Sequence, residues 1–200
     1  AISISATETA LNIYLAEKLR AFRTDYPGIR LRISNHSTPQ ALQAVKNGEV
    51  DFAVITTPAE VESGLKMVEL KPFYEVLVGG RTFTALASQN LSLKELNNYP
   101  LISLSDESMT RAFYRQFFLD HGAVLKPDTE AATTDLMLTL VKSELGIAFL
   151  PQSMAQDALA RGEIVQLHLQ EIIPQRSICL VYDHHRPLTT AARKFPQMLP

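Results

Sequence analysis

The stretch from Gly48 to Thr56, GEVDFAVIT, limits most strongly how this chain can fold. From Val50 onward it is an almost continuous apolar run, interrupted only by Asp51. Such a run is typical of a parallel strand, because helices cover both faces of a parallel sheet. Gly48 stands where the end of a helix needs a residue in the left-handed conformation. The stretch therefore predicts a helix ending near Gly48, followed by a buried strand ending near Thr56.

The same alternation of short strands and amphipathic helices continues along the chain. Leu11, Leu15 and Leu19 have helical spacing, and Ser5 with Glu8 forms the S-x-x-E pattern of a capping box before them. Strands are expected at residues 2–4, 29–33, 50–56, 76–78, 101–104, 129–132, 147–150, 164–169 and 178–182. Helices are expected between these strands, among them 92–96, 109–121, 135–143, 151–161 and 189–195. This order predicts an α/β fold with mostly parallel sheets.

Composition excludes several classes of function. The 200 residues suit one large domain or two small lobes, and the formal net charge of -2 argues against DNA binding by these residues alone. The start of the chain lacks the features of a signal peptide, and no apolar run is long enough for a membrane helix. The only cysteine, Cys179, is expected to be a buried apolar residue. We therefore expect a soluble, cytoplasmic protein.

Polar side chains gather where the predicted strands end. Ligands of open α/β sheets bind beyond the carboxyl ends of the strands, and those positions here are rich in hydroxyl groups. The threonines are Thr7, Thr9, Thr56, Thr57, Thr133 and Thr134. They would converge if the two series of strands and helices faced each other. The alternative is that each hydroxyl only caps a helix, although caps do not explain Thr56 and Thr57 at a strand end.

Charged clusters give weaker hypotheses. Glu49 and Asp51 could be an acid/base pair, but they stand at the amino end of their strand, where a polar turn is the simpler interpretation. His184 and His185 follow Asp183, yet neighbouring strand residues point to opposite faces, so a solvated turn is favoured over a metal site. His36 follows a strand and could contact a ligand or water. No nucleophile elbow, dinucleotide motif or Walker loop is present, so no cofactor or metal is expected.

Three segments carry a resemblance to a known family. They are FRTDYPGIRL at residues 22–31, GEVDFAV at 48–54, and LVKSELGIAFLP at 140–151. In this order and spacing they resemble the effector-binding domain of LysR-type transcriptional regulators, over essentially the whole chain. Ser5 and Glu144 depart from the family pattern, which often has glycine at both positions. The departure at Glu144 leaves the local turn open, because the helix dipole disfavours a carboxylate at a helix C-terminus.

The resemblance implies two Rossmann-like subdomains joined by two crossover strands, as in periplasmic binding proteins of type II. Subdomain I would be residues 1–72 and 168–200, and subdomain II residues 73–167. A small anionic or polar effector would bind in the cleft between them. The resemblance implies these contact residues: Ser5, Thr7, Thr9, Ser37, Thr38, Thr56, Thr133 and Thr134. The pair Thr7 and Thr9 is similar to that of family members that respond to sulfur-containing anions.

The resemblance also implies the partners. Family members form homodimers or tetramers, here through the helices Thr9–Phe22 and Met109–His121, and bind DNA through an N-terminal winged helix-turn-helix. No such segment is present, so we expect this chain to be the ligand-sensing part, with no enzymatic activity. A solute-binding protein of a transporter is the first alternative, and an enzyme with two lobes is the second.

Overall fold

The computed structural model describes residues 1–200, which divide into two compact units. Unit 1 comprises Ala1–Pro72 and Arg176–Pro200, and unit 2 comprises Phe73–Gln175. The chain therefore leaves unit 1 once and returns to it once. None of the helices is both long and apolar enough to cross a membrane.

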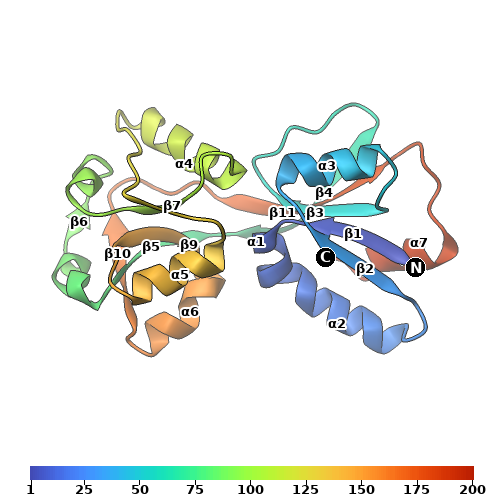
Figure 1. Ribbon diagram of the computed structural model, residues 1–200, viewed down its shortest axis with the longest axis horizontal. Helices are drawn as coiled ribbons and strands as arrows, with labels where there is room; N and C mark the ends of the chain where they lie inside the picture. The colour runs from blue at the N-terminus through green and yellow to red at the C-terminus, as the bar shows by residue number, and fades with distance from the viewer. The chain divides into compact units, whose positions relative to one another are not determined.

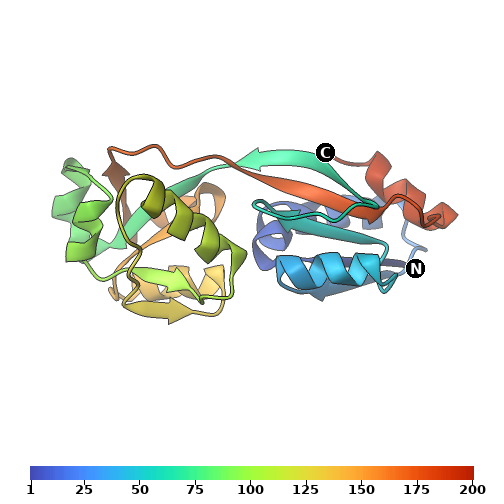
Figure 2. The same cartoon turned by 90° about the horizontal axis from the view of Figure 1, so that it is seen from above.

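Unit 1 is built on a five-stranded sheet with the order β2-β1-β3-β11-β4. Its strands are β1 (Ile2–Ala6), β2 (Leu31–Asn35), β3 (Phe52–Thr56), β4 (Leu65–Phe73) and β11 (Arg176–Asp183). Its helices are α1 (Glu8–Ala10), the π-helix η1 (Leu11–Leu15), α2 (Ala16–Asp25), α3 (Thr38–Lys46) and α7 (Thr190–Gln197). β1 runs parallel to β2 and β3, whereas β11 pairs with β3 in the antiparallel direction. Figure 1 shows α2 and α3 on opposite sides of this sheet, and Figure 2 shows β11 beside β4.

All five residues of β3 are buried, which confirms the predicted strand between two layers of helices. Phe52 packs against Phe195 of α7, with ring centroids 5.6 Å apart. Ala53 and Ile55, which alternate with it, lie in the core cluster that α3 completes on the other face. Gly48 has φ +73°, the left-handed conformation predicted for the turn before this strand.

Unit 2 repeats the layered plan with different strand directions. Its strands are β5 (Glu75–Gly80), β6 (Asn90–Leu91), β7 (Ile102–Leu104), β8 (Thr129–Ala131), β9 (Ile147–Pro151) and β10 (Ile164–Leu169). Its helices are the 3-10 helices η2 (Arg81–Ser88) and η3 (Lys94–Asn98), with α4 (Met109–Asp120), α5 (Thr134–Lys142) and α6 (Gln152–Ala160). β5 is antiparallel to both β9 and β10, so the expectation of mostly parallel sheets does not describe this sheet. The sequence-based boundary at residue 168 falls inside β10, which pairs with β5 and β6 in unit 2.

The aromatic side chains of α4 belong to the core of unit 2. Tyr114, Phe117 and Phe118 are buried, and Tyr114 stacks on Phe149 of β9 with centroids 4.5 Å apart. On the other face of the sheet, Met137 and Val141 of α5 pack in a second cluster with residues of β5, β9 and α6. The helix predicted at 109–121 is thus confirmed, and its aromatic stripe packs inside the unit.

The start of the first helix differs from the prediction. Ser5 lies in β1, paired with Ala53 and Ser34, and the cap of the following helix is Thr7, whose hydroxyl accepts a hydrogen bond from the Ala10 N–H. The capping box predicted from Ser5 and Glu8 is therefore wrong, because strand pairing holds Ser5 in extended conformation. A capping box does form at α3, where Ser37 is the cap and Gln40 its partner.

Glu144, the second departure from the family pattern, has a structural role. It follows α5, and its φ of +69° lies in the left-handed region that residues other than glycine rarely adopt. Its carboxylate accepts hydrogen bonds from the Thr82 hydroxyl and N–H, at 2.5 and 3.1 Å, and from the Arg81 N–H at 2.7 Å. These bonds, led by the Thr82 hydroxyl, lower the pKa of Glu144 below its ordinary value. The carboxylate therefore satisfies the free N–H groups at the start of η2.

Candidate functional site

The carboxyl ends of β1, β2 and β3 meet at one edge of the unit 1 sheet. β1 lies between β2 and β3, and all three run in the same direction. The Thr7 N–H donates to the Val54 carbonyl at 3.1 Å, and the His36 N–H donates to the Ala6 carbonyl at 3.1 Å. These bonds bring the loops after the three strands together. We call this place the carboxyl edge; six of the predicted site residues lie here: Ser5, Thr7, Thr9, Ser37, Thr38 and Thr56.

Ser5 and His36 form a contact between two of these strands. Ser5 is fully buried in β1, and its Oγ lies 2.8 Å from Nδ1 of His36, which is exposed just beyond β2. Either group can donate in this bond, depending on the tautomer of the imidazole. His36 therefore faces solvent and also joins the polar network of the carboxyl edge.

Two helices begin at the carboxyl edge, each with a hydroxyl cap. Thr7 caps the continuous helical segment from Glu8 to Asp25, and its Oγ1 accepts from the Ala10 N–H at 3.4 Å. Ser37 caps α3, and its Oγ accepts from the Gln40 N–H at 3.4 Å. Helix N-termini carry partial positive charge, so both starts favour negative charge nearby. Thr9 and Thr38, within the first turns, are buried.

Thr56 ends β3 beside a buried arginine. Arg176 is 2% exposed; its Nη2 donates to Thr56 Oγ1 at 3.3 Å, and its Nε donates to the Thr57 carbonyl at 2.8 Å. Next to it, the Ser177 N–H donates to Thr57 Oγ1 at 2.9 Å. Sequence reasoning missed Arg176. Its only local signal is a charge at the start of β11, two residues before the apolar run that begins at Ile178. Its role comes from the antiparallel pairing of β11 with β3.

These contacts decide what the hydroxyl groups still offer. A hydroxyl has one O–H donor and two acceptor lone pairs. The oxygens of Thr7, Ser37, Thr56 and Thr57 each accept a hydrogen bond from a backbone N–H or from a guanidinium. Their acceptor capacity is therefore partly used inside the protein, while each O–H can still donate. Such a set suits a ligand rich in oxygen acceptors, and an anion in particular.

The two remaining predicted site residues, Thr133 and Thr134, lie in unit 2. Thr133 caps α5, and its Oγ1 accepts from the Leu136 N–H at 3.2 Å. Thr134 is buried in the first turn of the helix. The chemistry at this helix start is the same as that of Thr7 and Ser37.

The amino end of β3 has a different role. Asp51 Oδ2 accepts from the Ser3 N–H at 2.9 Å, so this carboxylate secures the start of β1 against β3. Glu49 is exposed, and its Oε1 accepts from the side chain of Asn47 at 3.2 Å. The two carboxylates thus bond to neighbouring protein groups, as expected of a structural turn.

Other candidate chemistry finds no support. No cluster of three or more His, Cys, Asp or Glu side chains could hold a metal ion. The Asp183 carboxylate accepts from the His185 N–H at 2.9 Å within a turn. Cys179 is buried, as predicted, and desolvation raises the pKa of its thiol to about 11, with a smaller contribution from Glu69. A thiol with this pKa stays protonated at neutral pH and is a poor nucleophile.

Comparison with known proteins identifies the family. The family described as "LysR substrate binding domain" matches residues 1–200. The chain therefore belongs to the LysR substrate-binding domains. A probable RuBisCO transcriptional regulator from Nostoc sp. is 25% identical over 97% of this chain, which spans 59% of that regulator's length. SsuR from Burkholderia cenocepacia, an HTH-type transcriptional regulator, is 24% identical over 84% of this chain, which spans 54% of SsuR.

Solved structures agree on the fold. The regulatory domain of CcmR from Synechocystis, in complex with 2-PG, has a TM-score of 0.86 at 20% identity, covering 98% of this chain and 93% of that one. The effector-binding domain of QuiR, in complex with shikimate, has a TM-score of 0.83 at 20% identity, with the same coverage. The chain thus has the fold of LysR effector-binding domains, which is that of type II periplasmic binding proteins, as predicted.

Proposed function

We propose that this chain senses a small anionic or polar metabolite and thereby controls DNA binding and transcription by a longer, cytoplasmic LysR-type regulator. The hydroxyl groups of the carboxyl edge would hold the ligand, with Thr133 and Thr134 as further candidates. The observation that carries the proposal is the hydrogen bonding of Thr7, Ser37 and Thr56, whose oxygens accept bonds from the protein while their O–H groups can donate.

Charge at the carboxyl edge supports an anionic ligand. Two helix N-termini begin there, and the Arg176 guanidinium lies against Thr56. That CcmR and QuiR have been solved in complex with 2-PG and shikimate supports a small-molecule effector for this chain as well. The ligand would act by favouring one conformation of the regulator over another.

A thermal-shift panel tests the proposal. Sulfate, small carboxylates and amino-acid derivatives would be titrated against the purified chain. At least one should raise the melting temperature in a saturable way, because a ligand that binds only the folded state stabilises it. If no member of the panel gave a saturable shift, the sensing proposal would lose its support.

For assembly, we propose a homodimer or tetramer that uses the helical segment Thr9–Phe22 and the helix Met109–His121. Leu119, on the second of these, is 53% exposed although it is a large apolar residue. Sedimentation of the full regulator should show dissociation when Leu119→Lys is introduced, and an unchanged mass would contradict this interface. A Val124→Lys variant is a matched control, since Val124 is 52% exposed and lies outside both helices.

A further inference from the structure

His36 brings an imidazole to the carboxyl edge, where the predicted contact residues offer hydroxyl groups. It directly follows β2, and its N–H donates to the Ala6 carbonyl at 3.1 Å, so its backbone is tied to the end of β1. The next residue, Ser37, caps α3. The side chain of His36 is exposed. The imidazole therefore stands in a fixed place, beside a helix start and open to solvent.

Ser5 fixes which nitrogen of this imidazole faces the sheet. Ser5 of β1 pairs with Ser34 of β2, and His36 stands two positions beyond Ser34. Residues two apart on an extended chain point to the same face, which brings the imidazole over Ser5. The Ser5 Oγ lies 2.8 Å from Nδ1, and the ring makes no other hydrogen bond within the protein. Nδ1 is thus engaged by the sheet, and Nε2 is left for a ligand.

The burial of Ser5 also selects the tautomer of the imidazole. Ser5 is fully buried, and its Oγ has the bond to His36 as its one hydrogen bond. If Nδ1 carried the proton of a neutral imidazole, the Ser5 O–H would be buried without an acceptor. Orphaned buried donors are rarer than underused acceptors, because the lost hydrogen bond to water is not replaced. The Ser5 O–H therefore donates to Nδ1, and the proton of the ring is on Nε2.

We propose that His36 is a specificity-determining residue of the carboxyl edge, whose Nε2–H donates to an oxygen of a small oxyanion such as a carboxylate or sulfate. This role rests on the function proposed above for the edge. Because Nε2 presents a donor, an ammonium group of a ligand at this place would be disfavoured.

Ser5 would then be a positioning residue that acts through His36. Glycine, which the family often has at this position, carries no hydroxyl to bond Nδ1. The exchange of glycine for serine therefore accounts for one of the two departures from the family pattern, as the other is accounted for by the bonds of Glu144 to η2.

Nitrogen NMR of the imidazole in the ligand-free chain tests the positioning by Ser5. Long-range correlations report which ring nitrogen carries the proton, under mildly alkaline conditions where an imidazole is neutral. The signal of His36 is identified by its loss in His36→Phe. The unchanged chain should show the Nε2–H tautomer alone, and Ser5→Ala should show a mixture of both tautomers. An Nδ1–H tautomer in the unchanged chain, or a mixture that Ser5→Ala leaves as it was, would overturn the proposal.

Titration with sodium sulfate and with sodium acetate, at constant ionic strength, tests the contact with the ligand. The Nε2 signal of His36 should shift saturably with at least one of the two anions. His36→Phe should weaken binding of that anion roughly tenfold, because it removes a hydrogen bond to a charged group. His36→Gln can place an amide N–H near the position of Nε2 and should stay within about threefold of the unchanged chain. Ser5→Ala should lie between these two variants.

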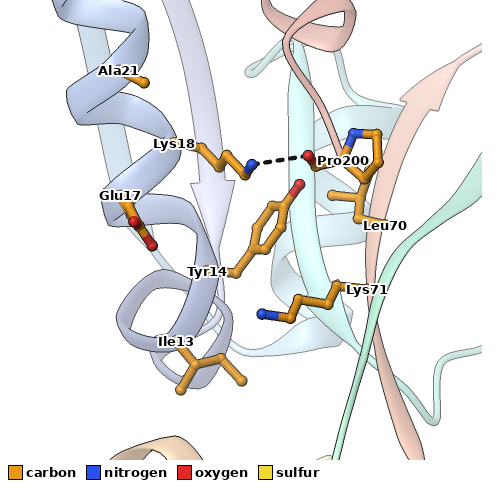
Figure 3. A pocket seen from close by; sticks show the side chains of 8 residues that line it. All are labelled: Ile13, Tyr14, Glu17, Lys18, Ala21, Leu70, Lys71 and Pro200. Carbon is orange, nitrogen blue, oxygen red and sulfur yellow. Dashed lines mark hydrogen bonds between the residues drawn. The ribbon is translucent and has the colours of Figure 1, made fainter.

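Two controls separate this contact from other effects of histidine and of charge. His184→Phe should bind like the unchanged chain, because His184 is exposed in the turn after β11, which lies toward the amino end of β3. Figure 3 shows a different place in unit 1 that could attract anions, where Lys18 donates to the Pro200 carbonyl at 2.9 Å and Lys71 extends from β4. A variant with Lys18→Met and Lys71→Met should keep the response of the His36 signal.

The outcomes distinguish this role of His36 from the function of the edge. A saturable rise in melting temperature that is equal in the unchanged chain and in His36→Phe would overturn the role of His36 and leave the sensing function standing. A His36 signal that responds to neither anion would overturn the role as well. If, in addition, no member of the thermal-shift panel gave a saturable shift, the sensing function would fall with it.

Discussion

The two ends of β3 both carry polar residues, yet their hydrogen bonds differ in kind. At the amino end the Asp51 carboxylate, which can only accept, bonds to the Ser3 N–H of the neighbouring strand. At the carboxyl end the Thr56 and Thr57 hydroxyls accept from Arg176 and Ser177 and can still donate. The position along the strand therefore tells more about the role of a residue than its formal charge does. The carboxylate at the amino end bonds within the protein, whereas the hydroxyl groups at the carboxyl end can still donate hydrogen bonds.

Among the changes at the two ends of β3, Arg176→Met should lower stability the most. It leaves the Thr57 carbonyl and the Thr56 hydroxyl without their buried donor, so the free energy of unfolding should fall by about 3 kcal/mol. Urea unfolding measures this. Arg193→Met, at an exposed position of α7, is the matched control and should change little. A loss for Arg176→Met no larger than the control's would show that the carboxyl end does not need the guanidinium.

Asp51→Ala should come next and should affect folding alone. It removes a hydrogen bond between a carboxylate and a backbone N–H, so about 1.5 kcal/mol of unfolding free energy should be lost. Asp51→Asn keeps an acceptor oxygen and should lose less. The affinity for any effector found in the thermal-shift panel should stay the same for both variants. A drop in affinity with unchanged stability would reverse the assignment of the two ends.

Thr56→Val tests the opposite end with a change of nearly equal shape. The donor lost from the carboxyl edge should weaken effector binding about fivefold, which corresponds to one ordinary hydrogen bond. Binding would be followed by titration at a temperature where the variant is folded, because the variant also removes an acceptor of the buried Arg176 and should lower stability. Wild-type affinity in this variant would indicate that the hydroxyl only secures the loop.

Much of the fold could be predicted because the decisive patterns are local. The burial of β3 follows from its apolar run, and the end of α4 follows from the glycine after it. The structure gives this glycine, Gly122, a φ of +70°. β4 was not predicted, since most of its side chains are exposed and its sequence does not alternate. The capping box predicted at Ser5 does not form. Ser5 pairs with two neighbouring strands, and this pairing overrides the local sequence motif.

The candidate site was predicted in part for the same reasons. Hydroxyl residues that follow strands can be found from the strand pattern, so the sequence alone predicts Thr7, Ser37 and Thr56 as site residues. Arg176 could not be found in this way, because it reaches Thr56 only through pairing of segments far apart in the sequence.

Glu49→Ala should have the smallest effect on stability. It separates the hydrogen bond of Asp51 to Ser3 from the general effect of a negative charge in this turn. Glu49 is exposed, and its contact is with the nearby side chain of Asn47, so the free energy of unfolding should change by less than about 0.5 kcal/mol. Urea unfolding of the two alanine variants under one set of conditions compares them directly. Because both remove one carboxylate from the same turn, a general effect of charge would appear in both. If Glu49→Ala cost as much as Asp51→Ala, the stabilisation would belong to the charge of the turn, and the bond to Ser3 would lose its special role.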